Sequence, residues 1–310
     1  MKRSPKVAVV VLNWNGLADT SECLESLGTI TYANYHIIVI DNGSSGDDAQ
    51  VLQERFSDSI QLIAGAENVG FAGGCNIGIR SALARGADYI LLLNNDTVVD
   101  PAFLSVLVQA AEEIPDGAAF CPKICYYDRP RVIRSTGGRV NAWMGRAWQV
   151  GRDRPDEGSY GHVHVEERDY ADGACMLIRR GALERVGLLD EEYFAYWEET
   201  DWCARAAEAG YRSYYVSAAR VWHKTARSQA PDSDYYYLYR RNALLFLRKR
   251  KSPLHLLSAV SLYLFVFGPF YLIRHPGAIR RLLAEARAFF WHLTSFFRPR
   301  GAAVRGRKPD

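Results

Sequence analysis

Three short apolar runs, each followed by polar turn residues and a helix-like segment, constrain the fold of this chain most. The runs are Val7–Leu12, His36–Asp41 and Tyr89–Asn94, and they are rich in Val, Ile and Leu. Such runs are typical of parallel strands that crossover helices bury on both faces. The sequence therefore predicts an α/β fold with a Rossmann-like, mostly parallel sheet and flanking helices. Ligands bind such a sheet at the carboxyl ends of its strands, so the loops after these runs are the first candidates for a site.

The segments between the runs carry signals of helix starts. Asp19 can cap a helix through Leu27, Asp47 can cap a second one, and Pro101 suits the first turn of a third. These signals support the alternation of strands and helices in the first half of the chain.

The second half is regular only in parts. From Cys121 to Asp172 we expect hairpins and loops, because short β-prone pieces alternate with glycine-rich turns. Ala174–Ile178 predicts a strand, Arg179–Val186 a short helix, Glu199–Ala209 a helix closed by a following glycine, and Tyr211–Val216 a strand.

Charge and cysteine usage exclude several classes of protein. The 310 residues hold 38 basic and 35 acidic side chains, a formal charge of +3, so we expect no nucleic-acid partner. The six cysteines include one close pair, Cys121 and Cys125, without a second pair at zinc spacing, which favours reduced, buried thiols. The N-terminal apolar run is too short for a signal peptide, so we expect a cytoplasmic protein.

Polar residues follow the second predicted strand and the loop after Ala64. Asp41 could accept hydrogen bonds from a pyrimidine base or a ribose, although an Asx turn with Asp47 as helix cap explains the same residues. Between Glu67 and Asn76, three glycines would let the backbone approach a ligand, and Asn76 offers an amide. The Gly-x-Gly-x-x-Gly order is absent, which disfavours a dinucleotide fold.

Two further segments concentrate oxygen ligands and acids. Asn94, Asn95 and Asp96 end the Tyr89–Asn94 run, as a hard divalent cation that holds a diphosphate would require. Glu198-Glu199-Thr200-Asp201 lies between tryptophans at a predicted helix start. The alternative for Asp201 is an ion pair with Arg205, one helical turn later.

Together these motifs resemble the family 2 glycosyltransferases with the GT-A fold, especially the rhamnosyltransferase-like branch that builds bacterial cell-surface polysaccharides. The resemblance runs from Val7 to about Arg250 and includes Tyr239-Arg240-Arg241-Asn242, which looks like the segment that closes the catalytic domain. It implies that Asp96 and His223 hold a divalent cation, Mg²⁺ or Mn²⁺. It also implies nucleotide-sugar binding by Asn13, Asn15, Asp41, Asn68, Gly70, Phe71, Gly73, Asn76, Asn94, Asn95, Asp172, Gly173 and Ala174.

The resemblance also implies that the Glu198-Glu199 pair includes the catalytic base. Asn94 replaces the first Asp of the usual metal motif, and Glu199 stands where many relatives have Asp. Glu198 and Asp201 share one helical face, whereas Glu199 points about 100° away, so we assign the base to Glu199 and keep Asp201 as the alternative.

The implied activity is an inverting transfer of a sugar from a nucleoside diphosphate donor to a hydroxyl of a glycan or a lipid-linked acceptor. The branch favours dTDP-L-rhamnose, with UDP-hexoses as alternatives. A nucleotidyltransferase is disfavoured because the loop after Leu12 has no lysine. A non-catalytic carbohydrate-binding or scaffold protein would keep the fold but lose the acids. The oligomeric state is left open, a homo-oligomer included.

The chain after Lys251 predicts a separate, membrane-associating region, which divides the protein into residues 1–250 and 251–310. Leu256–Ile273 is nearly all apolar, at the lower limit of about 18 to 20 residues for a membrane span. Gly268-Pro269 interrupts it, and basic clusters flank it. We therefore expect helices that lie on the inner face of the cell membrane rather than cross it. A soluble helical hairpin is the alternative.

Overall fold

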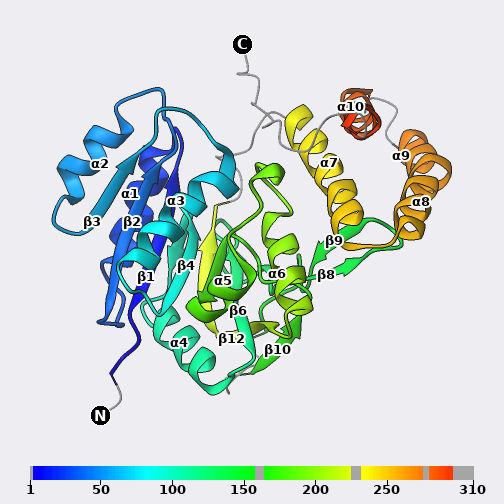
Figure 1. Ribbon diagram of the computed structural model, residues 1–310. Coiled ribbons are helices and arrows are strands. Elements are labelled where there is room, and N and C mark those ends of the chain that lie inside the picture. Colours follow the sequence, from blue (N-terminus) through cyan, green and yellow to red (C-terminus); the bar gives the residue numbers. More distant parts are fainter. Residues whose placement is uncertain (1–2, 158–163, 225–231, 275–278, 296–310) are drawn as a thin grey trace.

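A mixed sheet forms the centre of the protein in the computed structural model, which describes residues 3–157, 164–224, 232–274 and 279–295 (Figure 1). Within the described residues, the sheet contains β1 (Val7–Asn13), β2 (Tyr35–Asp41), β3 (Ile60–Ala64), β4 (Tyr89–Asn94), β5 (Thr97–Val99), β6 (Gly117–Tyr126), β7 (Ile133–Ser135), β10 (Val165–Arg168), β11 (Cys175–Arg179) and β12 (Arg212–His223). The main path runs β10-β12-β6-β11-β4-β1-β2-β3. β1 pairs in parallel with β2 and β4, and β6 with β12, whereas β11 is antiparallel to both of its neighbours. The predicted α/β class and mostly parallel sheet are confirmed.

Helices cover both faces of this sheet. They are α1 (Leu17–Leu27), α2 (Asp48–Phe56), α3 (Gly70–Ala84), α4 (Phe103–Glu113), α5 (Arg180–Val186) and α6 (Glu198–Glu208). Side chains of β1 alternate between the two faces, so Val9 joins a core with α1 and α4, and Val10 joins a second core with α3, α5 and α6. Burial on both faces explains why the strands read as continuous apolar runs.

Strand register brings the predicted site residues to one edge. Asn13 pairs with Asp41 across β1 and β2, and Leu12 pairs with Asn94 across β1 and β4. The antiparallel strand β11 begins at this edge, so residues 172–174 lie there as well. β12 ends at the same edge with His223, which pairs with Thr97 of β5.

The segment that begins at Gly117 is a correction to the sequence prediction. We expected hairpins and loops from Cys121 onward, but β6 continues to Tyr126 and is buried at every position. Pro122 hid this strand, because proline lacks an N–H group and is rare in central strands. Its partner Val216 is the point where β12 shifts register and resumes at Arg220, so the irregularity falls beside the proline.

The helix starts also differ from expectation. Asp19 lies inside α1, which begins after Gly16, and its side chain accepts a 2.7 Å bond from Lys224. Asp47 precedes α2 but makes no side-chain capping bond, and α4 begins at Phe103, after Pro101.

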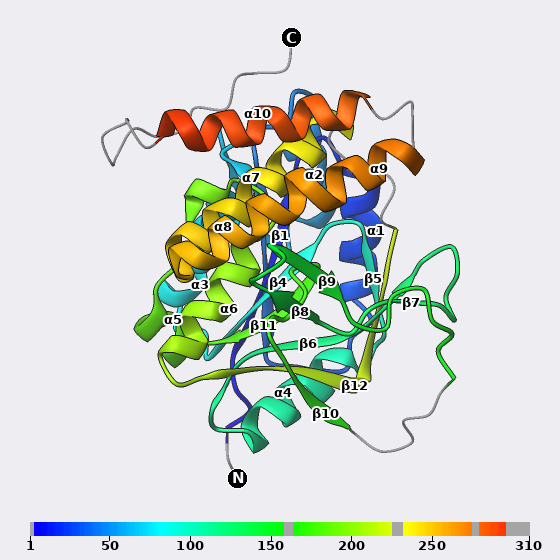
Figure 2. The same ribbon diagram turned by 90° about the vertical axis from the view of Figure 1, so that its right-hand side faces the viewer.

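In the part of the chain that the structure describes, four helices follow the sheet and pack beside it (Figures 1 and 2). They are α7 (Asp232–Arg250), α8 (Pro253–Leu262), α9 (Gly268–Arg274) and α10 (Ile279–Ser295). A π-helical turn, Tyr263–Phe267, joins α8 to α9, and the Gly268 N–H donates to the Tyr263 carbonyl. Pro269 explains this turn, because its ring clashes with the carbonyl four residues earlier and it has no N–H to donate.

Pro253–Tyr271 is, within the described residues, the one helical stretch long and apolar enough to cross a membrane, with a mean hydropathy of 1.6 and 11% of it buried. These helices do not form a separate core. Ala259 of α8 shares a buried cluster with Ala243 and Phe246 of α7, and Trp291 of α10 packs against it. The proposed boundary at residue 250 therefore runs through one hydrophobic cluster. The basic residues after 297 lie outside the described part of the chain.

Candidate functional site

The loops after β1 and β2 are joined by buried polar side chains. The Asn13 Nδ2 donates to Asp41 Oδ1 at 2.7 Å and to Asp48 Oδ2 at 3.0 Å. Asp41 also accepts from the Ser44 hydroxyl (2.6 Å) and backbone N–H (3.1 Å), three residues later in the same loop. The exposed Asn15 extends this cluster, because its Oδ1 accepts hydrogen bonds from the backbone N–H and the hydroxyl of Ser45. These hydrogen bonds hold the polar groups of the two loops in place.

The glycine-rich segment forms the first turns of α3 rather than the expected loop. Gly70 has φ +82°, and a Cβ there would lie 2.5 Å from the Phe194 ring. A Cβ on Gly73 would lie 3.0 Å from Val69, and Phe71 packs against the core. Gly70 therefore allows close contact between α3 and the chain that leads to α6, and Gly73 allows Val69 to pack on the first turn of α3.

The amides of the same segment are also engaged within the protein. Asn68 Oδ1 accepts from the Gly70 N–H at 2.8 Å and from Asn42 at 3.0 Å. Asn76 donates to the Leu189 carbonyl at 2.9 Å and accepts from the Leu189 N–H at 3.0 Å. Asn76 is 1% exposed, so it fastens the chain before α6 rather than offering an amide to a ligand.

Asp96 and His223 meet at the edge of the sheet. The His223 Nε2 lies 2.9 Å from Asp96 Oδ1 and 3.2 Å from Asn94 Nδ2. Pairing of β5 with β12 causes this contact between residues far apart in the sequence. Asp96 Oδ2, Asn94 Oδ1 and His223 Nδ1 are buried without hydrogen-bond partners. The neighbouring Asn95 turns away and donates to Thr20 at 2.9 Å.

This pair is a partial donor set for a cation. Within the described residues, no three His, Cys, Asp or Glu side chains converge as a metal site would require. Two protein ligands are fewer than the six that a hard divalent cation usually takes, so phosphate oxygens and water would have to supply the others. The unpartnered buried oxygens of Asp96 and Asn94 fit a cation that is held together with a diphosphate.

Arg134 is a cation in the site that sequence reasoning did not identify. Its guanidinium donates to Asp172 Oδ2 at 3.3 Å, and the Ala174 N–H donates to Asp172 Oδ1 at 3.0 Å. Burial would raise the pKa of Asp172, but Arg134 and these hydrogen bonds hold it below its usual value. The charge of Arg134 also acts on the carboxyl groups of Asp96 and Glu199. No local motif marks Arg134, because its partners are distant in sequence.

Glu199 lies against the segment that contains Asp172. A Cβ on Gly173 would lie 3.5 Å from the Glu199 Cγ, so the Glu199 side chain lies within van der Waals reach of this position. The Glu199 Oε2 is buried without a hydrogen-bond partner. Burial, with the negative charge of Asp172, raises the pKa of Glu199 to about 7. A carboxyl with this pKa can take up a proton near neutral pH.

Glu198 has different surroundings from its neighbour. It is 4% exposed, its Oε2 has no partner, and its charge acts on the buried Cys75 of α3. Burial and the charge of Glu199 raise its pKa well above the usual value. Glu198 is therefore a buried acid that loses its proton less readily than a free glutamate.

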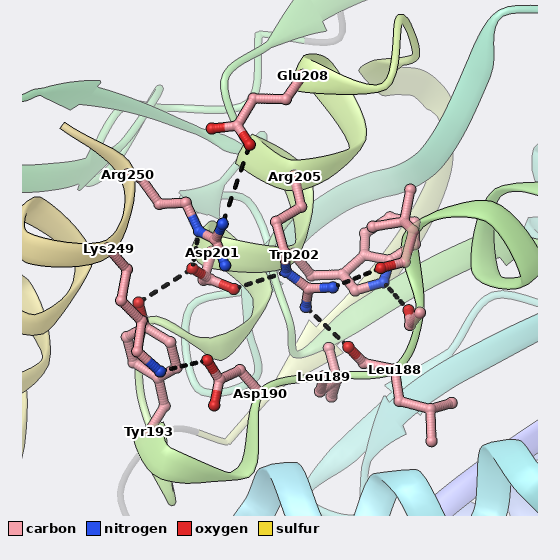
Figure 3. A network of polar contacts seen from close by, with 12 residues as sticks. Leu188, Leu189, Asp190, Tyr193, Asp201, Trp202, Arg205, Glu208, Lys249 and Arg250 are labelled. Atoms are coloured by element: carbon pink, nitrogen blue, oxygen red, sulfur yellow. Dashed lines mark hydrogen bonds and ion pairs between the residues drawn. The ribbon is translucent and has the colours of Figure 1, made fainter. Parts of the chain in front are cut away.

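Asp201 is the centre of a network of ion pairs and hydrogen bonds (Figure 3). Arg205 Nε lies 2.9 Å from its Oδ2, and Arg250 Nε lies 2.7 Å from its Oδ1. The Tyr193 hydroxyl donates to the same Oδ1 at 3.1 Å. Asp201 is 0% exposed and both of its oxygens are paired, which includes the ion pair with Arg205 that the sequence left open.

A strained turn precedes the two glutamates. Phe194, Tyr196 and Trp197 all have positive φ angles, of 63°, 70° and 76°, which residues other than glycine rarely adopt. Arg241 and Asn242 of α7 hold this turn. The Asn242 Nδ2 lies 2.7 to 2.8 Å from three of its carbonyl oxygens, and Arg241 donates to two. Arg241 and Asn242 thus fix the start of α6 and the direction of Glu199.

Comparisons with known proteins identify the family and the fold. The family model "Glycosyltransferase like family 2" matches residues 5–235. An N-acetylglucosaminyl-diphospho-decaprenol L-rhamnosyltransferase of Mycobacterium tuberculosis is 27% identical over 79% of this chain and 84% of its own. A dTDP-rhamnosyl transferase of Shigella flexneri is 25% identical over 71% of this chain and 73% of its own.

A solved structure resembles the fold over nearly the whole chain. It is a mannosyltransferase from Pyrobaculum calidifontis in complex with GDP-Man and Mn²⁺, with a TM-score of 0.58 and 17% identity. The match covers 96% of this chain and 81% of that one, so it extends into the helices after α7. Family match, fold and the arrangement of the sheet edge lead to one conclusion: the chain belongs to glycosyltransferase family 2 and has the GT-A fold.

Proposed function

We propose that this glycosyltransferase transfers a sugar from a nucleoside diphosphate donor with inversion at the anomeric carbon, and that Glu199 is its base. The observation that carries the proposal is the buried Glu199 carboxyl, whose pKa of about 7 and unpartnered Oε2 suit proton transfer. Glu199 takes the proton of the acceptor hydroxyl as that oxygen bonds to the anomeric carbon. The bond from this carbon to the diphosphate breaks, and the nucleoside diphosphate leaves.

The surroundings of Glu199 support inversion. A retaining mechanism with a covalent intermediate would need a second carboxylate as nucleophile. Glu198 faces α3, Asp201 is paired with two arginines, and Asp172 already accepts from Arg134 and a backbone N–H. Glu199 is the carboxylate of this group with a free oxygen on the side of the sheet edge.

We assign the donor to the rest of the edge. Asn13, Asn15 and Asp41 would bind the nucleotide, and residues 172–174 would line the sugar. Arg134 carries the positive charge that a departing diphosphate requires. Asn68, Gly70, Phe71, Gly73 and Asn76 support this edge from α3 through the contacts described above.

A divalent cation completes the proposal. Asp96 and His223, with the Asn94 amide oxygen, would hold it, because these buried atoms lack partners and suit Mg²⁺ or Mn²⁺. When bound, the cation would offset the charge that develops on the leaving diphosphate. The solved mannosyltransferase of similar fold contains Mn²⁺, which supports this assignment.

The relatives guide the choice of substrates. One is named for rhamnosyl transfer to a diphospho-decaprenol acceptor, and the other for dTDP-rhamnose. We therefore propose dTDP-L-rhamnose as donor and a lipid-linked glycan as acceptor. The exposed apolar side chains of α8 and α9 would rest on the cytoplasmic face of the membrane that contains this acceptor.

The test is a transfer assay with purified protein, dTDP-L-rhamnose or UDP-hexoses, Mg²⁺ or Mn²⁺, and an N-acetylglucosaminyl-diphospholipid acceptor. The proposal predicts transfer from dTDP-L-rhamnose, and a product whose anomeric configuration by NMR is opposite to that of the donor. Retained configuration would overturn the mechanism. A folded protein that binds no nucleotide sugar and transfers nothing would favour the non-catalytic alternative.

A further inference from the structure

A cavity of about 470 Å³ lies among the C-terminal helices, and Glu199 is not among its lining residues. Three arginines line it: Arg146 of β9 (Arg146–Gln149), Arg240 of α7 and Arg281 of α10. β9 forms a hairpin with β8 (Gly138–Asn141), and Figures 1 and 2 show this hairpin beside α7 and α8. We call this cavity the arginine pocket. Residues from the sheet region and from the tail thus meet in one cavity.

The arginine pocket has excess positive charge. Glu285 is the acid in its lining, 3.1 Å from Arg281 Nε and 3.7 Å from Arg240 Nη2. Three guanidinium groups and one carboxylate leave two positive charges. Arg240 is 9% exposed, and its Nε has no hydrogen-bond partner among the described residues. A buried, unpartnered guanidinium N–H is costly, so this pocket is suited to an anion that accepts from it.

Aromatic rings hold the three guanidinium groups. The Cζ of Arg146 lies 4.1 Å from the centre of the Phe267 ring. Arg240 lies 4.1 Å from that of Tyr263, and Arg281 lies 4.0 Å from that of Tyr271. Stacking uses the faces of the guanidinium planes and leaves their N–H edges for other partners. Planar, oriented N–H edges are the groups that bind phosphate in two-point contacts.

The rim of the arginine pocket is apolar. Val266 and Phe270 belong to its lining and are 49% and 58% exposed. On the same helical stretch, Phe265 is 78% exposed and Ile273 is 79% exposed. An inorganic phosphate or a free nucleotide would make no use of such a surface. A ligand that carries both an anionic group and a hydrocarbon chain would use both parts.

The arginine pocket is connected to the proposed catalytic residues by two short paths. Arg240 follows Tyr239, whose ring centre lies 5.8 Å from that of Trp197, two residues before Glu199. The Tyr239 hydroxyl donates at 2.9 Å to the carbonyl of Ala147, the neighbour of Arg146. An acceptor anchored at the arginines would therefore extend toward the helix that carries Glu199.

We propose that the arginine pocket binds the diphosphate of the lipid-linked acceptor, with the lipid chain on the apolar surface of α8 and α9. This inference rests on the proposed function, because it names where the acceptor is held. A diphosphate that joins a sugar to a lipid has two negative charges, which match the two excess positive charges of the pocket. The phosphodiester of an ordinary anionic phospholipid has one.

The first test compares two acceptors for Arg146→Gln and Arg281→Gln, which remove charge without opening the core at Arg240. Arg287→Gln is the matched control, because Arg287 is an exposed arginine of α10 outside the cavity lining. For each variant, kcat/KM for the lipid-diphosphate acceptor is divided by kcat/KM for the same sugar as a methyl glycoside. We expect this ratio to fall about tenfold in the pocket variants, because each loses one charge-assisted hydrogen bond. The ratio should stay at the wild-type value in the control. An unchanged ratio in both pocket variants would overturn the proposal.

The second test measures binding without catalysis. Full-length protein is floated with vesicles of phosphatidylcholine that contain either decaprenyl diphosphate or phosphatidylglycerol, adjusted to equal surface charge. We expect stronger binding to decaprenyl diphosphate, and loss of this preference in Arg146→Gln and Arg281→Gln. Equal binding to both vesicles, affected equally by the substitutions, would mean attraction to any anionic membrane and would refute the diphosphate site. A preference that depends on the arginines, in a protein that transfers no sugar, would refute the proposed function and leave the pocket standing.

Discussion

Adjacent residues of α6 have opposite roles because a helix turns them toward different surroundings. Glu198 faces α3, Asp201 faces two arginines, and Glu199 faces Asp172 and Gly173 at the edge of the sheet. Three acids within four positions thus become a buried acid with a raised pKa, a partner of two arginines and a group that titrates near neutral pH.

The pH dependence of turnover should report Glu199. Only its deprotonated form can accept a proton, so kcat at saturating donor should rise with pH through a midpoint near 7. Stability should change in the opposite direction. Burial raises the folded-state pKa above 4.5, so the contribution of Glu199 to stability is complete below pH 4.5 and is lost as pH rises through about 7. Rate measurements and thermal unfolding from pH 5 to 9 check both trends; a rate that is flat across this range contradicts the assignment.

Substitutions at the cation pair should separate binding from chemistry. Asp96→Ala should abolish transfer, and His223→Ala should raise the Mn²⁺ concentration for half-maximal activity. Mutations outside the ligand shell already cost about 10–100-fold in metal affinity, so loss of a ligand should cost at least as much. Thermal shifts with nucleoside diphosphate and Mn²⁺ give a readout independent of activity. Full activity of the native protein in excess chelator would rule out the cation.

Much of the site could be predicted because strand ends and site residues are adjacent in sequence. Asp41, Asp96 and residues 172–174 all follow or precede strands that apolar runs reveal. Arg134 could not be predicted, because its contact with Asp172 depends on how β7 and β11 approach the same edge. The role of the glycines of α3 was hard to predict for a related reason. A glycine indicates that another group lies close to the backbone, but the sequence does not say whether that group is a ligand or a residue such as Phe194.

At the scale of elements, α7 and the turn before α6 act as one unit. The turn contains three residues in the left-handed region, a conformation that costs about 1–3 kcal/mol per residue and persists only where the surroundings impose it. The buried side chains of Arg241 and Asn242 impose it through the carbonyl oxygens of the turn. The sequence after the catalytic region therefore sets the geometry of the catalytic helix.

Asn242→Ala should disturb this unit. Loss of the hydrogen bonds should cost about 1–3 kcal/mol of stability and, because Glu199 loses its direction, should lower kcat more than it changes donor KM. Asn242→Asp should behave alike, since a carboxylate cannot donate to carbonyl groups. Asn34→Ala is the control, because Asn34 donates to a single carbonyl, that of Ser4, far from the site in sequence. If kcat is unchanged in a folded Asn242→Ala protein, the turn does not position Glu199.

The elements themselves were predictable to different degrees. β1, β2 and β4 have continuous apolar runs, so their positions follow from the sequence. The position of β6 could not be predicted, because Pro122 interrupts the pattern of a central strand. β12 is longer than predicted, because the register shift obscures its second half in the sequence. The positive φ angles before α6 leave no mark in the sequence, since Phe, Tyr and Trp do not normally adopt them.

At the scale of the whole molecule, one hydrophobic cluster joins the sheet region to the tail. Phe246 of α7, Ala259 of α8 and Trp291 of α10 pack together, so truncation after residue 250 would expose the face of α7. Point substitutions on the exposed surface of the tail test its role more cleanly. In the proposed arrangement, the exposed apolar surface of the tail lies on the membrane. The sheet edge with Glu199 then lies within reach of a lipid-linked acceptor.

Phe265→Glu should weaken the association with membranes. This side chain is 78% exposed, so its loss should not change the folded core. Burial of a Phe is worth about 1.5–3 kcal/mol, so partition into anionic vesicles should fall about tenfold or more. Ser59→Glu adds the same charge at an exposed position beside β3 and is the control. Equal sedimentation of both variants with vesicles would reject the membrane surface.

The most direct measurement of the central claim is turnover of Glu199→Gln beside Asp201→Asn, at saturating donor and with the folded fraction of each protein known. Glu199→Gln should stay folded and bind donor but lose at least a hundredfold in turnover, within the range of about 10²–10⁴ for a lost general base. Asp201→Asn should lose stability, because Arg205 and Arg250 would keep buried charges without their partner, and its folded fraction should turn over at a near-normal rate. Near-native turnover of Glu199→Gln together with a folded, donor-binding and inert Asp201→Asn would contradict the account and make Asp201 the base.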